Sequence, residues 1–291
     1  MFRYPIQRTI ALATFVHAAI AFAATTTPEV GPIQHATITV ADGATIAYHI
    51  RPGTGPTLVL IPGSWGDYHA YDGLLLNLPS AYNVVIVEMR GHGDSAPPTL
   101  NGSIELFADD VLSVVKHLEL KHFYVGGHSI GGMIAIEIAG RAPAGLLGAI
   151  SMEGWTHYQV QREAFGGNDA PTLSPELARE REALHARVKD RLTPEQREAF
   201  GGVWRKWDGS KILETTTLPI LEIWGDRGKA RPNLALLRIP DQPNICLVWI
   251  ANASHSYLFE KPGDVASAID HFVVETAGKV PTGVLSPDSR R

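Results

Sequence analysis

Apolar residues gather in short continuous runs along this chain, and each run predicts a buried strand. Apolar side chains fill successive positions in these runs, which is typical of strands covered on both faces. The runs occupy residues 57–63, 83–89, 123–129, 146–152, 218–225 and 244–251. Residues 35–50 instead alternate apolar and polar side chains around Asp42 and Gly43, a pattern that predicts a β-hairpin.

Segments with helical spacing separate many of these runs. In residues 103–120 the apolar side chains recur every three or four positions, and Ser103 is the expected N-cap. Residues 130–140 and 264–278 predict two further apolar helices. Strands that alternate with helices predict an α/β protein with a mostly parallel central sheet and helices on both faces.

A charged segment interrupts this alternation before the run at 218–225. Ser174-Pro175 and Thr193-Pro194 each combine an N-cap residue with a first-turn proline, and Gln196 completes a capping box with Thr193. We expect the helices that start there to form a lid over the strand ends. The predicted organisation is a core over 36–155 and 218–278, a helical lid over 156–217 and a flexible tail over 279–291.

The first residues have the pattern of a secretory signal peptide. Arg3 and Arg8 precede an apolar stretch that continues past His17 to Ala21-Phe22-Ala23. This stretch is too short for a stable membrane span. The sequence predicts a signal peptide over 1–23, cleavage after Ala23, a linker over 24–35 and a secreted or periplasmic protein. Mass spectrometry of the exported protein should then show a start near Ala24; an uncleaved anchor or a buried helix is the alternative.

Composition narrows the class of protein. The 291 residues are 45% hydrophobic and 19% charged, which supports one sizeable core and excludes an intrinsically disordered chain. The formal net charge is −5 and the basic residues are scattered, so we expect no nucleic-acid partner. The single cysteine, Cys246, cannot form an intrachain disulfide and is expected to be inert in the core.

One short motif points to chemistry. Residues 127–131 read G-H-S-I-G, which matches G-x-S-x-G, at the end of a predicted strand and the start of a predicted helix. That context places Ser129 on a sharp strand-to-helix turn, where small neighbours let strand and helix approach and the helix N-terminus favours negative charge. The alternative is an ordinary turn in which the Ser129 hydroxyl caps the helix.

With this motif and three other landmarks, the chain resembles the α/β-hydrolase superfamily over nearly all of its mature length. The landmarks are LIPGSWG (60–66), EMRGHGDS (88–95), GGHSIGG (126–132) and ANASHSYLFEKP (251–262), in the order of that family. The resemblance implies an α/β-hydrolase fold with a helical lid after the sixth strand. It also implies a nucleophilic Ser129, with His255 as the base that takes its proton.

The oxyanion of such a reaction needs two preorganised donors. The resemblance assigns one to the backbone N–H of Ile130 and the other to the loop after the third strand, where Ser64 is the candidate and Trp65 the next. His128 should point away from the turn, and His92 is expected to be structural. We expect Trp65, Trp155 and His157 to line the substrate pocket.

Two carboxylates compete for the third catalytic position. After the strand 218–225 many relatives read G-x-x-D, whereas this chain reads Gly225-Asp226-Arg227-Gly228, so that Asp226 lies two residues early. Haloalkane dehalogenases include members with the acid at the end of the preceding strand, and zearalenone lactonases place a glutamate there; Glu153 occupies that place. We favour Glu153 over Asp226, because pairing with His255 would offset the cost of its burial. The alternative for Glu153 is a salt bridge, with Arg90 as a possible partner.

These residues together predict a cofactor-free serine hydrolase that cleaves a carboxylic ester through an acyl-enzyme. Serine at the turn argues against dehalogenase or epoxide hydrolase chemistry. No Gly-rich phosphate loop and no metal-spaced His/Cys cluster stands in the sequence, so no cofactor or metal is expected. The substrate is expected to be a small ester or lactone. Lactonase, amidase, carbon–carbon hydrolase, acyltransferase and perhydrolase chemistry, or ligand binding without turnover, remain alternatives.

Overall fold

The structure, a computed structural model, describes residues 31–166 and 173–277. The expected signal peptide (1–23) and tail (279–291) lie outside the described residues, as does most of the expected linker. Export therefore stays a prediction from the sequence. The first strand begins at Gln34, two residues before the expected start of the core.

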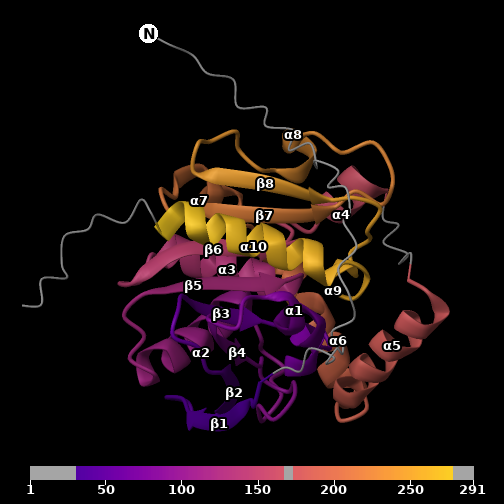
Figure 1. The fold of residues 1–291 in the computed structure, drawn as a ribbon. Helices are drawn as coiled ribbons and strands as arrows, with labels where there is room; N and C mark the ends of the chain where they lie inside the picture. The colour runs from indigo at the N-terminus through magenta and orange to yellow at the C-terminus, as the bar shows by residue number, and fades with distance from the viewer. Residues whose placement is uncertain (1–30, 167–172, 278–291) are drawn as a thin grey trace, which may run out of the picture.

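An eight-stranded sheet forms the centre of the molecule (Figure 1). Its strands are β1 (Gln34–Thr39), β2 (Thr45–Arg51), β3 (Thr57–Ile61), β4 (Asn83–Val87), β5 (Phe123–His128), β6 (Leu146–Met152), β7 (Ile220–Gly225) and β8 (Ile245–Ile250). They lie in the order β1-β2-β4-β3-β5-β6-β7-β8. Strand β2 pairs antiparallel with β1 and β4, and all other pairs are parallel. The predicted mostly parallel sheet with an antiparallel hairpin at its edge is confirmed.

Helices cover both faces of this sheet. The core helices are η1 (Tyr68–Tyr71), α1 (Asp72–Asn77), α2 (Ile104–His117), α3 (Ile130–Arg141), α8 (Leu234–Leu237), α9 (Tyr257–Glu260) and α10 (Pro262–Ala277). Alternate residues of each strand face opposite layers: Val59 of β3 belongs to the cluster with α2 and α3, whereas Leu60 belongs to the cluster with α1 and α10. This alternation explains why the sequence shows continuous apolar runs, since each strand is covered on both sides.

The charged segment between β6 and β7 folds as predicted into helices. They are α4 (Val160–Phe165), α5 (Pro175–Lys189), α6 (Pro194–Gly202), η2 (Val203–Lys206) and α7 (Ser210–Thr215). The Ser174 hydroxyl accepts from Leu177 N–H, and Thr193 forms the expected capping box with Gln196. Helix α5 contacts α9, and both lie at the opposite end of the sheet from α7 (Figure 1).

Strand β8 differs from the expectation for its apolar sequence. It is the last strand of the sheet, and only Ile250 of its six residues is fully buried. Cys246 is exposed, so its predicted place in the core is wrong. An edge strand lacks a neighbour on one side, and its residues therefore keep contact with solvent despite their apolar character.

Candidate active site

Ser129 stands on the turn between β5 and α3 in a strained backbone conformation. Its φ of 55° and ψ of −121° lie outside the regions that non-glycine residues favour. A Cβ atom added at Gly127 would lie 2.3 Å from the backbone of Gly131, and one at Gly131 would lie 2.1 Å from the Ile61 carbonyl oxygen. The glycines on either side are therefore required by the close approach of strand and helix.

The Ser129 side chain is not used as a helix cap. It makes no capping hydrogen bond to α3, and Ser129 lines a cavity together with His255 and Ser64. The alternative in which this hydroxyl only caps a helix therefore does not hold.

His255 and Glu153 are brought together from two loops at the carboxyl ends of the strands. Nδ1 of His255 lies 2.6 Å from Oε2 of Glu153. Glu153 follows β6, and Gly154 comes next because a Cβ at that position would lie 2.3 Å from the Gly132 backbone. The pair leaves Nε2 of His255 as the ring nitrogen that does not contact the carboxylate. The glutamate thereby fixes which imidazole nitrogen can serve as a base.

Arg227 completes the surroundings of Glu153. Its Nη1 and Nη2 donate to Oε1 and Oε2 of Glu153 at 2.6 and 2.9 Å, and Gly225 N–H donates to Oε1 at 2.8 Å. Burial of Glu153, which is fully inaccessible, would raise its pKa, but the bonds and charges of His255 and Arg227 outweigh burial and lower it to about 2. Glu153 is therefore a buried carboxylate that stays ionised at neutral pH.

The structure places the competing residues elsewhere. Oδ1 of Asp226 accepts from the backbone N–H groups of Gly228 at 2.9 Å and Asn252 at 2.7 Å, so Asp226 joins two loops rather than contacting His255. Arg90, considered as a partner of Glu153, pairs instead with Asp110 and with Asp42 of the β1–β2 hairpin.

The loop after β3 carries the expected oxyanion donors. Trp65 has a φ of 67°, and its N–H donates to Nε2 of His92 at 3.2 Å, so it is already engaged. Among the hydrogen bonds of the described residues, neither Ser64 N–H nor Ile130 N–H has a protein acceptor. Burial lowers the pKa of His92 to about 4, so this ring remains a neutral acceptor that holds the loop.

His128 has a role that the sequence did not show. Its side chain does not point away from the site: Nε2 lies 2.7 Å from the carbonyl oxygen of His255, and the two rings lie 4.7 Å apart. Because a carbonyl only accepts, Nε2 of His128 carries the proton. Burial, with the neighbouring His255 ring, lowers the pKa of His128 to about 3, so the ring is neutral and anchors the His255 loop. Its position beside Ser129 was the only signal in the sequence.

The cavity has walls from the core and from the helical insertion. Gly63, Ser64 and Trp65 form one side, the His255–Phe259 region another, and Arg181, Leu184 and His185 of α5 the third. Its volume is about 180 Å³. Of the three predicted pocket residues, Trp65 therefore lines the cavity.

The other two predicted pocket residues lie outside its lining. Trp155 stacks on the His255 ring with centroids 5.2 Å apart, and His157 packs on Tyr158 and pairs with Asp208. Trp204 of the insertion packs edge-on against Trp155, so this pair joins the insertion to the core.

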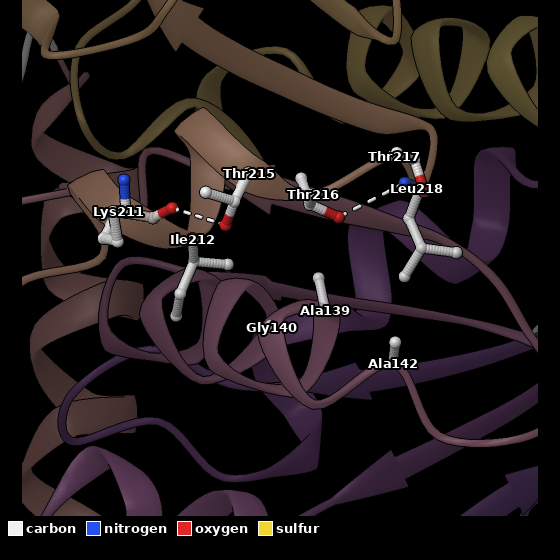
Figure 2. A pocket seen from close by; sticks show the side chains of 9 residues that line it. All are labelled: Ala139, Gly140, Ala142, Lys211, Ile212, Thr215, Thr216, Thr217 and Leu218. Atoms are coloured by element: carbon white, nitrogen blue, oxygen red, sulfur yellow. Dashed lines mark hydrogen bonds between the residues drawn. The ribbon is translucent and has the colours of Figure 1, made fainter.

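A second cavity lies far from these residues, between the carboxyl end of α3 and α7 (Figure 2). Its polar side chains are mostly threonines that bond locally: Thr215 donates to the Lys211 carbonyl, and Thr216 accepts from Leu218 N–H. Apart from Lys211, its described lining residues carry no titratable side chain, although its volume of about 260 Å³ exceeds that of the Ser129 cavity. We therefore assign no chemistry to it.

The Ser129 cavity holds the parts needed to activate a hydroxyl. A hydroxyl on a strained turn, an imidazole fixed by an ionised carboxylate and two free N–H groups can together generate a nucleophile and hold a developing oxyanion. In the part of the chain that the structure describes, no cluster of metal ligands was found. No described helix has the length and apolar character needed to cross a membrane.

Known proteins show the same fold. A family model described as the alpha/beta hydrolase fold matches residues 56–203. An esterase from Thermogutta terrifontis is 21% identical with a TM-score of 0.62, over 84% of this chain and 99% of its own. The enol-lactonase from Burkholderia xenovorans is 19% identical with a TM-score of 0.63, over 82% of this chain and all of its own.

A curated relative is similar in sequence over most of this chain. It is the dihydrolipoyllysine-residue acetyltransferase component of the acetoin cleaving system of Cupriavidus necator, 25% identical over 77% of this chain. The chain spans less than two thirds of the length of the first curated relatives that it matches, 65% in this case.

Proposed function

This chain belongs to the α/β-hydrolase fold family, and from that premise we propose that it is a serine hydrolase in which Ser129, His255 and Glu153 form the catalytic triad. Membership of this family supports hydrolase chemistry. The proposal adds the serine mechanism, a preference for an ester and export through residues 1–23.

The main support for the proposed triad is the hydrogen bond between His255 and Glu153. A carboxylate buried beside an imidazole, and neutralised in part by Arg227, is expensive to maintain for structure alone. In the proposed reaction this carboxylate holds the proton of His255 on Nδ1 and stabilises the imidazolium that forms when Nε2 takes the proton of Ser129.

The proposed reaction has two halves. Ser129 Oγ attacks the substrate carbonyl carbon while His255 takes its proton, and the N–H groups of Ile130 and Ser64 bind the oxyanion. The alcohol then leaves with the proton from His255, and an acyl-enzyme remains. Water, deprotonated by His255, attacks this ester and releases the acid, which restores Ser129.

Acyl transfer is the second candidate. The curated relative from Cupriavidus necator is named as an acetyltransferase component, and the same acyl-enzyme could be attacked by an acceptor other than water. The small cavity of about 180 Å³ and its apolar residues Leu184, Leu258 and Phe259 favour a short acyl group in either case.

The test is turnover of a short-chain p-nitrophenyl ester by the mature protein and by Ser129→Ala. We expect Ser129→Ala to lose about 10⁴-fold or more in kcat. Ser113→Ala, which changes a serine on α2 that bonds to the Asp109 carbonyl, serves as the matched control and should keep full activity. A fluorophosphonate probe should add its mass to Ser129 alone.

A folded wild-type protein that neither turns over any ester or lactone nor reacts with the probe would overturn the proposal. Stoichiometric capture of a ligand without turnover would then favour a binding function.

A further inference from the structure

Helix α5 brings one charged side chain into the Ser129 cavity. Arg181 lines the cavity, and its Nη1 donates to the hydroxyl of Ser256 at 2.8 Å. Ser256 directly follows His255, so the guanidinium lies close to the proposed base. Sequence patterns do not single out Arg181, because it lies in a segment rich in charged residues.

This arginine has no acidic partner. Among the described residues, no carboxylate forms an ion pair with Arg181, and its buried Nε has no hydrogen-bond partner. Arg187 on the same helix, by contrast, pairs with Asp67 at 3.4 Å. A partly buried cation with unused donors is costly unless a ligand supplies the missing acceptors.

Among the described residues that line the cavity, no acidic side chain competes with a ligand for Arg181. The lining contains no aspartate or glutamate among the described residues, and Leu184, Leu258 and Phe259 make part of it apolar. Burial, together with the charges of Lys189 and Arg181, lowers the pKa of His185 to about 4, so its ring is neutral at pH 7. The fixed charge that a bound substrate meets is therefore positive.

We propose that Arg181 is a specificity-determining residue that binds a carboxylate of the substrate, so that the natural substrate is an ester or lactone with an anionic acyl part. A guanidinium presents parallel donors that match the two oxygens of a carboxylate. The volume of about 180 Å³ limits the acyl part to a few carbons between that carboxylate and the reacting carbonyl. This inference rests on the proposed serine hydrolase function.

A structural role for Arg181 makes a different prediction. If Arg181 only fastens α5 to the His255 loop through Ser256, its loss should affect every substrate equally. A carboxylate-binding role makes its loss depend on the charge of the substrate.

The experiment compares two p-nitrophenyl esters that differ only at the end of the acyl chain. The mono-glutarate ester ends in a carboxylate and the valerate ester ends in a methyl group. For Arg181→Gln we expect kcat/KM to fall about 10- to 100-fold on the glutarate ester, the usual range for a lost charged hydrogen bond, and to change less than about threefold on the valerate ester.

Two further variants serve as controls. Arg179→Gln removes an exposed arginine of the same helix that does not line the cavity, and it should leave both esters unchanged. Arg181→Lys keeps the charge without the planar fork and should give an intermediate loss on the glutarate ester.

A binding measurement separates this inference from the proposed function. Free glutarate should bind Ser129→Ala in calorimetry, and the double variant with Arg181→Gln should not bind it. If wild type hydrolyses neither ester but glutarate still binds through Arg181, the proposed function fails and the carboxylate-binding role of Arg181 alone stands. Turnover of both esters with equal losses in Arg181→Gln, or glutarate binding that does not need Arg181, would overturn the inference and leave the function intact.

Discussion

Two glutamates with no exposed surface lie close to each other in the strand order, one just after a strand and one within the next, and their surroundings give them different protonation states. Glu153 follows β6 and Glu222 lies within β7. The pKa of Glu153 is lowered to about 2, whereas burial raises the pKa of Glu222 to about 8. At neutral pH the first is therefore an anion and the second mostly a neutral acid.

The difference comes from their partners and not from burial. Glu153 receives two guanidinium bonds, one backbone N–H and the His255 ring. Glu222 has the Trp224 indole as a donor at 3.1 Å and no cation among its described contacts. A cation and several donors outweigh the cost of desolvation, whereas the neutral Ser151 hydroxyl and Trp224 indole do not. A buried carboxylate at a strand end thus becomes useful for catalysis only where such partners meet it.

The largest expected effect is on Glu153. Glu153→Gln replaces the anion with an amide that can neither hold the correct imidazole tautomer nor stabilise the imidazolium. We expect kcat to fall about 10³- to 10⁴-fold on a p-nitrophenyl ester. Steady-state kinetics of Asp226→Asn provides the control, because Asp226 bonds backbone groups and pairs with Arg231 rather than with His255, and its loss should lower kcat less than about threefold. The reverse order of losses would transfer the role to Asp226.

A smaller effect is expected when the cation beside Glu153 is removed. Arg227→Gln leaves a buried anion with weaker compensation, and we expect the free energy of unfolding at pH 7 to fall by about 3 kcal/mol. Arg227→Lys, which keeps the charge and loses the fork, should lose less.

The stability that Glu153 gains from Arg227 should depend on pH, in a direction that follows from the pKa of Glu153. The depressed pKa of Glu153 adds stability above its unfolded value near 4.5, and that stability is lost as the pH falls toward 2. The difference between wild type and Arg227→Gln should therefore shrink as urea unfolding is repeated from pH 5 to pH 3. A difference that stays constant over this range would mean that Arg227 acts through packing on the Phe165 ring, 3.8 Å away, rather than through Glu153.

Local patterns predicted much of the fold. The strands, the β1–β2 hairpin and the caps at Ser103, Ser174 and Thr193 follow from neighbouring residues, and the structure has each of them. The burial of β8 could not be predicted in this way. Whether a strand is central or at an edge depends on strand order, which its own residues do not specify.

The active-site residues show the same distinction between what neighbouring residues determine and what distant contacts determine. The position of Ser129 follows from its motif, because the turn is built by adjacent glycines. The contacts of Arg227, His128 and Arg181 each join segments far apart in the chain, so no spacing in the sequence revealed them. In Gly225-Asp226-Arg227-Gly228 the sequence drew attention to the acid, whereas the structure directs the neighbouring arginine toward the site.

The most direct test of the comparison is Glu222→Gln, because its stability should change with pH in the opposite direction. Glu222 has a raised pKa, so between about 4.5 and 8 the folded state keeps a proton that the unfolded state releases, and wild type loses stability as the pH rises. An amide resembles the neutral acid and cannot ionise. Relative to wild type, Glu222→Gln should therefore gain about 3 to 4 kcal/mol of unfolding free energy between pH 5 and pH 8. Urea unfolding at several pH values across that range measures the slope of the unfolding free energy against pH. Ester turnover should change less than about twofold, because Glu222 does not line the Ser129 cavity. A slope equal to that of wild type would show that Glu222 is ionised in the fold, and the contrast with Glu153 would then have to be explained by something other than their partners.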